Sequence, residues 1–117
     1  MVLQWCVAYD EVLAHRIREL TVGEPGVSEK RMFGGLAFLV NGHMAVTASR
    51  RGGVMIRTDP AVAERLLTTS RAQPLEMRGR VMRGWLRVDD EHVRTQRELE
   101  RWVRRGVAFA RSLPAKS

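Results

Sequence analysis

The sequence has little of what cross-links a protein or anchors it in a membrane. Its 117 residues include one cysteine, which cannot form an internal disulfide. No apolar run approaches the ~18 residues that a membrane-spanning helix needs, and the longest, at residues 36–40, is interrupted by Asn41-Gly42. The first residues lack a basic region, so we expect no signal peptide and a cytoplasmic location. Membrane proteins, disulfide scaffolds, zinc fingers and multidomain enzymes are therefore excluded.

Lysine is nearly absent, although the chain is strongly basic. Arginine supplies 18 of the 20 basic side chains, and only Lys30 and Lys116 are lysines. The formal net charge is +7, of which residues 61–117 hold +6 (thirteen basic and seven acidic side chains) and residues 1–60 hold +1. A basic half favours an anionic partner such as nucleic acid. A GC-rich genome also replaces lysine codons with arginine codons, and we favour that compositional explanation.

The rest of the composition is that of a soluble globular domain. Hydrophobic residues make up 44% of the chain and charged residues 28%. A chain of this length buries enough surface to fold without a metal or a disulfide. It contains no repeat, linker or low-complexity segment. We therefore expect a frayed extension at residues 1–8, a single domain at 9–114 and a short tail at 115–117.

Capping residues and apolar spacing predict three helices. The first begins after Asp10, the second starts at Asp59-Pro60, and the third opens with a capping box formed by Thr95 and Glu98. Residues at helical spacing in these segments are expected to face inward. They are Leu13, Ile17 and Leu20; Val62, Leu66 and, as a further candidate, Leu67; and Leu99, Trp102, Val103, Gly106, Phe109 or Ala110, and Leu113.

Five strands are predicted between these helices, at residues 36–40, 43–48, 54–57, 73–77 and 81–88. Asn41-Gly42 is the preferred pair for a type I′ hairpin turn, and its two-residue loop fixes the register of the first two strands. The expected pairs are Val40–His43, Leu39–Met44, Phe38–Ala45, Ala37–Val46 and Leu36–Thr47. The predicted order is α-β-β-β-α-β-β-α. This is a two-layer α+β fold, an antiparallel five-stranded sheet packed with helices.

The sequence offers no evident set of converging catalytic or metal-binding side chains. The three histidines match no metal-ligand spacing and are expected on the surface: His15, His43 and His92. Cys6 has no general base near it in sequence. The acidic residues 89–91 are expected to form a turn, and the glycine pairs at 34–35 and 52–53 a bulge or tight turn instead of a phosphate loop. We expect no enzymatic activity, no metal and no cofactor.

The arginines around Trp85 are the better candidates for binding. In an extended segment Arg83, Trp85 and Arg87 would share one face, where they could stack on bases or hold a phosphate. The alternative, which we favour, is a core Trp85 with arginine stems lying over it. The candidate interaction surface comprises Arg31, Met32, Phe33, Gly34, Gly35, Arg78, Arg80, Arg83, Trp85 and Arg87. A weaker anion or nucleic-acid contact is assigned to Arg101, Arg104 and Arg105, for which a solvated helix face is the favoured alternative.

Two blocks of the sequence carry a family resemblance. They are RMFGGLAFLVNGHM at residues 31–44 and MRGRVMRGWLRV at residues 77–88. Together with Asp10-Glu11, Asp59-Pro60 and the closing segment 102–114, they resemble the TfoX N-terminal domain of the TfoX/Sxy family. The resemblance spans nearly the whole chain from about residue 8. It implies a two-layer fold of order α-β3-α-β2-α, similar to that of secretion chaperones.

The resemblance also implies a regulatory function. The best-known family members are bacterial regulators of natural competence genes that act with a cyclic-AMP receptor protein and carry a second, C-terminal domain. Here we expect a stand-alone N-terminal domain, and no catalytic residues are carried over from the family. We expect a non-enzymatic, transcription-linked interaction module that contacts a protein partner, or nucleic acid weakly and without sequence preference, and no membrane. The alternatives are a chaperone-like protein-binding homodimer and an unrecognised enzyme.

Overall fold

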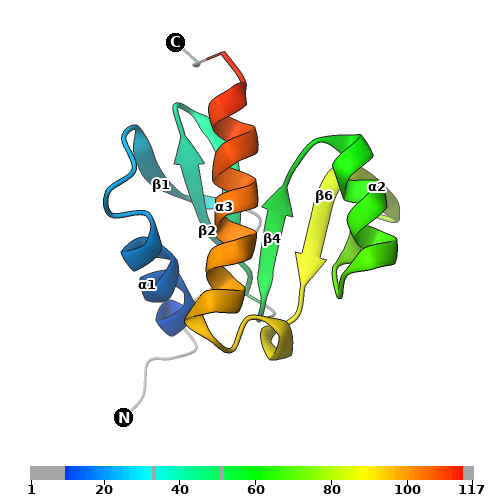
Figure 1. Cartoon of the computed structure of the whole chain (residues 1–117). Helices are drawn as coiled ribbons and strands as arrows, with labels where there is room; N and C mark the ends of the chain where they lie inside the picture. The colour runs from blue at the N-terminus through cyan, green and yellow to red at the C-terminus, as the bar shows by residue number, and fades with distance from the viewer. Residues whose placement is uncertain (1–9, 33, 51, 115–117) are drawn as a thin grey trace.

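The described residues form one six-stranded antiparallel sheet, and all three α-helices lie on the same face of it (Figure 1). The computed structural model describes residues 10–32, 34–50 and 52–114, so the predicted extension and tail lie outside them. The elements are α1 (Glu11–Leu20), β1 (Val27–Met32), β2 (Gly35–Val40), β3 (His43–Ala48), β4 (Val54–Arg57), α2 (Pro60–Thr69), β5 (Gln73–Met77), β6 (Arg80–Val88), the 3₁₀ turn η2 (Asp90–His92) and α3 (Gln96–Ser112). Across the sheet the order is β1-β2-β3-β4-β6-β5. None of the helices in the described ranges is long and apolar enough to cross a membrane.

The sheet has six strands, so the prediction of five is wrong. The additional strand is β1, an edge strand that pairs with β2 from Val27 opposite Val40 to Met32 opposite Gly35. Residues 28–31 are all exposed and mostly charged, so the segment lacks the apolar alternation that indicates a strand. Charges on an edge strand discourage pairing with other chains. The antiparallel α+β class is confirmed, whereas the likeness to secretion chaperones stays a prediction.

The hairpin at Asn41-Gly42 is confirmed, but its register is right only beside the turn. Both turn residues have positive φ (53° and 85°), as a type I′ turn requires. Val40 lies opposite His43 and Leu39 opposite Met44, and then the register shifts. The remaining pairs are Phe38–Val46, Ala37–Thr47 and Leu36–Ala48. Ala45 is thus the extra residue of a β-bulge, which spacing from the turn cannot reveal.

The three predicted helices form with the expected caps. Asp10 accepts a hydrogen bond from the Leu13 N–H (3.1 Å), and Asp59 accepts one from the Ala61 N–H (2.8 Å). Thr95 and the third helical residue, Glu98, cap each other's main-chain donors, so the capping box is confirmed. Local side-chain chemistry therefore decides where each helix starts.

Helix α3 closes the core over the central strands. Its buried residues are Leu99, Trp102, Val103, Gly106, Val107 and Ala110. Trp102 is only 7% exposed, which confirms it as a core residue. Of the alternatives Phe109 and Ala110, Ala110 is the buried one, and the guanidinium of Arg57 lies 5.4 Å from the centre of the half-buried Phe109 ring. Leu67 of α2 is exposed, whereas Leu66 is buried as predicted.

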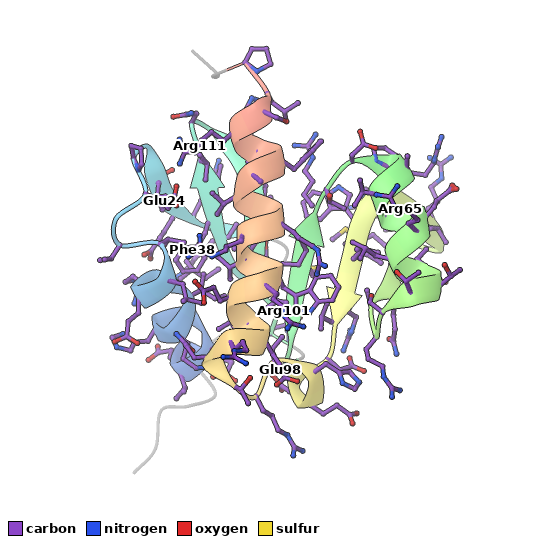
Figure 2. The ribbon with its side chains drawn as sticks, in the orientation of Figure 1. Glu24, Phe38, Arg65, Glu98, Arg101 and Arg111 are labelled. Carbon is purple, nitrogen blue, oxygen red and sulfur yellow. The ribbon has the colours of Figure 1, made fainter. Side chains whose placement is uncertain are left out.

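Hydrogen bonds from arginine side chains connect the segments of the helical layer. Arg16 of α1 donates to the carbonyl of Val93 just before α3 (2.7 Å). Arg111, near the end of α3, donates to the Glu24 carboxylate (2.8 Å) and to the Pro25 carbonyl (3.0 Å), and Figure 2 shows the two charged side chains on neighbouring segments. These contacts hold α1, its following loop and α3 over one face of the sheet. The opposite face, called the helix-free face below, carries no described helix.

Candidate interaction groove

Strand alternation directs two sets of side chains to the two faces of the sheet. Ile56 and Leu86 pair across β4 and β6 and belong to the core under the helices. The neighbouring pair, Met55 and Arg87, therefore points to the helix-free face. A groove of about 740 Å³ lies there, within the range of about 300–1,000 Å³ that is typical of ligand clefts. Its described lining is Gly34, Ser49, Arg50, Met55, Leu75, Glu76, Met77, Arg78, Arg80, Met82 and Arg87.

The floor of the groove is apolar and rich in methionine. Met55 and Leu75 are only 5% and 6% exposed, and Met77 and Met82 are half-buried. Unbranched methionine side chains adapt their shape to different apolar partners. Such a floor suits a binding surface that accommodates apolar side chains.

The rim of the groove is positively charged. Arg50, Arg78, Arg80 and Arg87 line it, against one acidic residue, Glu76. Arg87 donates to the Asp89 carboxylate (3.2 Å), whereas the other three arginines have no acidic partner in the described part of the chain. The groove therefore offers arginine donors that are available to an anionic ligand.

Arg50 reaches the groove over a glycine. The glycine is Gly34, in the turn between β1 and β2, and its φ of 75° suits a residue without a side chain. A Cβ at this position would lie 2.6 Å from Cδ of Arg50, so the arginine stem passes directly over the glycine. The next glycine, Gly35, lets the carbonyl of Ala48 approach where a Cβ would overlap it. The glycine pair is thus a tight turn with close packing, as the sequence indicates.

Arg78 occupies a backbone conformation that arginine rarely adopts. It is the first residue of the two-residue turn between β5 and β6, with φ of 53°, and Gly79 follows with φ of 78°. This is the pattern of a type I′ turn, in which asparagine or glycine is the preferred first residue. A non-glycine residue at positive φ destabilises the folded chain by about 1 kcal/mol. Arg78 thus holds a strained backbone conformation on the rim of the groove, and such strain clusters at ligand-binding sites.

A kink at Gly84 decides which side chains of β6 enter the groove. Gly84 has φ of 83°, its carbonyl accepts a hydrogen bond from Thr58 (2.7 Å), and the β5–β6 register shifts beside it. On the N-terminal side of the kink, Arg80 and Met82 line the groove. Arg83 and Trp85, on either side of Gly84, are not among the described lining residues. Arg87 lines the groove whereas Arg83 and Trp85 do not, so the three residues do not form the expected common binding face. Trp85 is half-buried and is not part of the core cluster, so the favoured prediction of a core Trp85 is wrong.

The acidic turn after β6 braces the loop between β3 and β4. Asp90 accepts a hydrogen bond from the Gly53 N–H (2.7 Å), and Gly52 leaves the room that this carboxylate occupies. This contact supports the predictions that residues 89–91 form a turn and that the glycine pair at 52–53 forms a bulge or tight turn. No group of His, Cys, Asp and Glu in the described ranges has the geometry to hold a metal ion.

The structure brings part of the predicted interaction surface together. Gly34, Arg78, Arg80 and Arg87 line one groove although more than forty residues separate the first from the others. Arg31 and Met32 lie on the edge strand β1, outside the lining, and Phe33 lies outside the described residues. Sequence reasoning missed the other lining residues, which are Ser49, Arg50, Met55, Leu75, Glu76, Met77 and Met82. Methionines in strands look like core residues, and only the three-dimensional structure shows that Met55, Met77 and Met82 line the groove instead.

The arginines of α3 belong to the other side of the molecule. Arg104 pairs with Glu100 (2.5 Å), and the guanidinium of Arg105 lies 4.7 Å from the centre of the Trp102 ring. Figure 2 shows Arg101 on α3, in the helical layer that covers the sheet. Of the predicted basic residues, Arg78, Arg80 and Arg87 therefore line the groove, whereas Arg101, Arg104 and Arg105 lie on α3.

Among the described residues, the carboxyl groups of Glu29 and Glu98 have a shifted pKa, and each shift has a structural explanation. Arg18 donates two hydrogen bonds to Glu29 (2.6 and 2.8 Å), which lower the pKa of that carboxyl. The main-chain N–H and hydroxyl of Thr95 lower the pKa of Glu98. One is a surface ion pair and the other a helix cap, and neither residue lines the groove.

Comparison with known protein families identifies the domain. A family model described as the TfoX N-terminal domain matches residues 19–110, which is most of the chain. The chain belongs to this family. The resemblance carried by the two sequence blocks is therefore confirmed, and every described residue that lines the groove lies within the matched TfoX N-terminal segment. A comparison with curated proteins gave no match.

Proposed function

We propose that this TfoX N-terminal domain is a non-enzymatic, cytoplasmic interaction module, linked to transcription regulation, that holds a protein partner in the groove of the helix-free face. The observation that carries the proposal is the convergence of a methionine-rich floor with an arginine rim. The link to transcription rests on the family resemblance.

The chemistry of the groove supports binding more than catalysis. The arginines of its rim can donate parallel hydrogen bonds to anionic groups, which suits them to holding an anion. The one carboxylate of the lining, Glu76, has no second acid or histidine beside it in the described lining. General acid–base chemistry uses a positioned side chain whose pKa lies near the working pH, such as histidine, and the described lining contains no histidine, cysteine, lysine or tyrosine.

Paired charge variants test the proposal. Arg78→Asn/Arg80→Gln, the groove variant, removes two rim charges and places the residue preferred for a type I′ turn at position 78. Arg97→Gln/Arg101→Gln, the α3 variant, removes the same charge from exposed positions of α3. Each tagged protein is incubated with extract of the native host, and the captured proteins are quantified by mass spectrometry. We expect a specific partner that the wild-type protein and the α3 variant retain and the groove variant loses.

The opposite pattern would count against the proposal. If the groove variant and the wild-type protein capture the same proteins in the same amounts, the groove is not the binding site. Thermal melting of both variants confirms that each is folded before capture.

A second candidate function is a chaperone-like protein-binding dimer formed through β1. This strand lies first in the sheet order and pairs with β2 alone, so its outer edge has no strand partner among the described residues. The charged side chains Glu29, Lys30 and Arg31 discourage such pairing, which is why this candidate ranks second. Sedimentation across a wide concentration range distinguishes the two, because the dimer model requires a concentration-dependent change in mass.

A further inference from the structure

The groove combines two kinds of surface that select for one kind of ligand. The apolar floor is formed by Met55, Leu75, Met77 and Met82, and the cationic rim by four arginines with a single glutamate. An apolar ligand alone would leave the rim unsatisfied, and a purely anionic ligand would leave the floor exposed to water. A ligand that carries both features gains from both surfaces.

We propose that the groove binds a short acidic peptide segment of a protein partner, with aspartate or glutamate side chains on the arginine rim and an apolar side chain such as leucine on the methionine floor. This inference rests on the proposed function and specifies the chemistry of the partner.

The rim fits carboxylates in number and in kind. Arg50, Arg78 and Arg80 have no acidic partner in the described part of the chain, and each can donate two parallel hydrogen bonds to one carboxylate. Arg87 donates a hydrogen bond to Asp89 of the same chain, so it is the least available of the four arginines for a ligand. The net charge of the described lining is positive by three, from four arginines and one glutamate.

The floor argues against single-stranded nucleic acid as the preferred ligand. Proteins that bind single strands stack the bases on aromatic side chains along a basic groove. None of the described residues that line this groove is aromatic. Methionine and leucine instead suit the aliphatic side chains of a peptide, and methionine tolerates some variation among them.

Fluorescence anisotropy with synthetic probes tests the proposal directly. The probe is a short labelled peptide of alternating acidic residues and leucines. Three controls accompany it: the same peptide with serine at each leucine, the same peptide with lysine at each acidic residue, and a labelled oligothymidylate of matched length. We expect saturable binding of the acidic leucine peptide and an affinity at least about tenfold lower for the serine control, because burying one leucine is worth at least about tenfold. The lysine peptide should bind more weakly because its charges repel the arginine rim, and the oligothymidylate because the described lining offers no aromatic side chain for its bases.

Variants of the full chain then place the peptide. The groove variant should bind the acidic leucine peptide about tenfold more weakly, because truncating charged partners at an interface weakens binding on that scale. Met82→Gln keeps the length of the side chain but removes apolar contact, and it should weaken binding of the leucine peptide more than binding of the serine peptide. The α3 variant should bind as the wild-type protein does.

Four results would overturn the inference. Equal affinity for the serine and leucine peptides would mean that charge alone drives binding. Tighter binding of the oligothymidylate would make nucleic acid the ligand. Equal loss of affinity in the groove variant and the α3 variant would place the peptide elsewhere. If partner capture depends on the groove but the acidic leucine peptide does not bind, the partner chemistry is wrong and the proposed function stands.

Discussion

Gly106 offers the sharpest test of how α3 lies on the sheet. A Cβ at this position would overlap the carbonyl oxygen of Ala45 and lie 2.9 Å from its carbonyl carbon. Ala45 is the bulged residue of β3, so the helix packs directly on main chain at the irregular point of the strand. Gly106→Ala must therefore move either the helix or the central strand.

We expect this substitution to destabilise the protein, whereas a glycine-to-alanine change in an ordinary helix interior is stabilising. Alanine normally stabilises a helix interior by about 1 kcal/mol relative to glycine. Overpacking destabilises a core by about 1–3 kcal/mol, and a rigid main-chain neighbour places this site at the upper end. We expect Gly106→Ala to lower the free energy of unfolding by about 2 kcal/mol. For a domain of this size that lowers Tm by roughly 8 °C.

Thermal unfolding followed by circular dichroism measures this change. Gly23→Ala is the matched control, because nothing lies within 4 Å of a Cβ built there and its φ is not in the positive range. The control should melt with the wild-type protein or slightly above it. A Gly106→Ala protein that melts at or above the wild-type Tm would show that α3 does not pack on Ala45 as described.

Three further predictions concern stability and charge. Trp102→Ala should lower the free energy of unfolding by ~3–5 kcal/mol through the cavity it leaves, and a variant that melts within a degree or two of the wild-type protein would contradict the helix register. The pKa of Glu98 is lowered in the folded state, so its contribution to stability is present at pH values above the pKa of an ordinary glutamate and is lost as the pH falls through the lowered pKa. Glu98→Gln should therefore make the free energy of unfolding fall less steeply at acid pH, as urea unfolding at several pH values would measure. Any affinity for duplex DNA should be weak and independent of sequence, and Arg101→Gln/Arg105→Gln should reduce the slope of log K against log salt by about two at most; tight, sequence-dependent binding at physiological salt would refute this prediction.

The parts of the fold that follow from short stretches of sequence are predictable. Asp10, Asp59 and Thr95 each cap a helix through a residue two or three positions away, and Asn41-Gly42 forms its turn from its own backbone preferences. None of these features depends on distant segments. The order of nearby residues is therefore enough to predict them.

The parts that depend on distant segments are missed or misplaced by sequence reasoning. β1 is held by main-chain pairing with β2 and has no apolar pattern of its own. The bulge at Ala45 and the kink at Gly84 arise where strands meet neighbours from elsewhere in the chain. The groove needs Arg50 beside Arg78, which no local rule relates. One local signal does exist, because a glycine such as Gly79 in the second position of a two-residue connection between strands is typical of a type I′ turn.

Methionine methyl NMR tests the role of the groove most directly. Of the five methionines in the described part of the chain, Met55, Met77 and Met82 line the groove, whereas Met44 of β3 does not and serves as an internal reference. On titration with the acidic leucine peptide, the methyl signals of the three groove methionines should shift together and saturate at one peptide concentration, while the signal of Met44 stays in place. If the peptide binds and these three signals do not move, or if Met44 shifts as much as they do, the groove of the helix-free face is not the binding site.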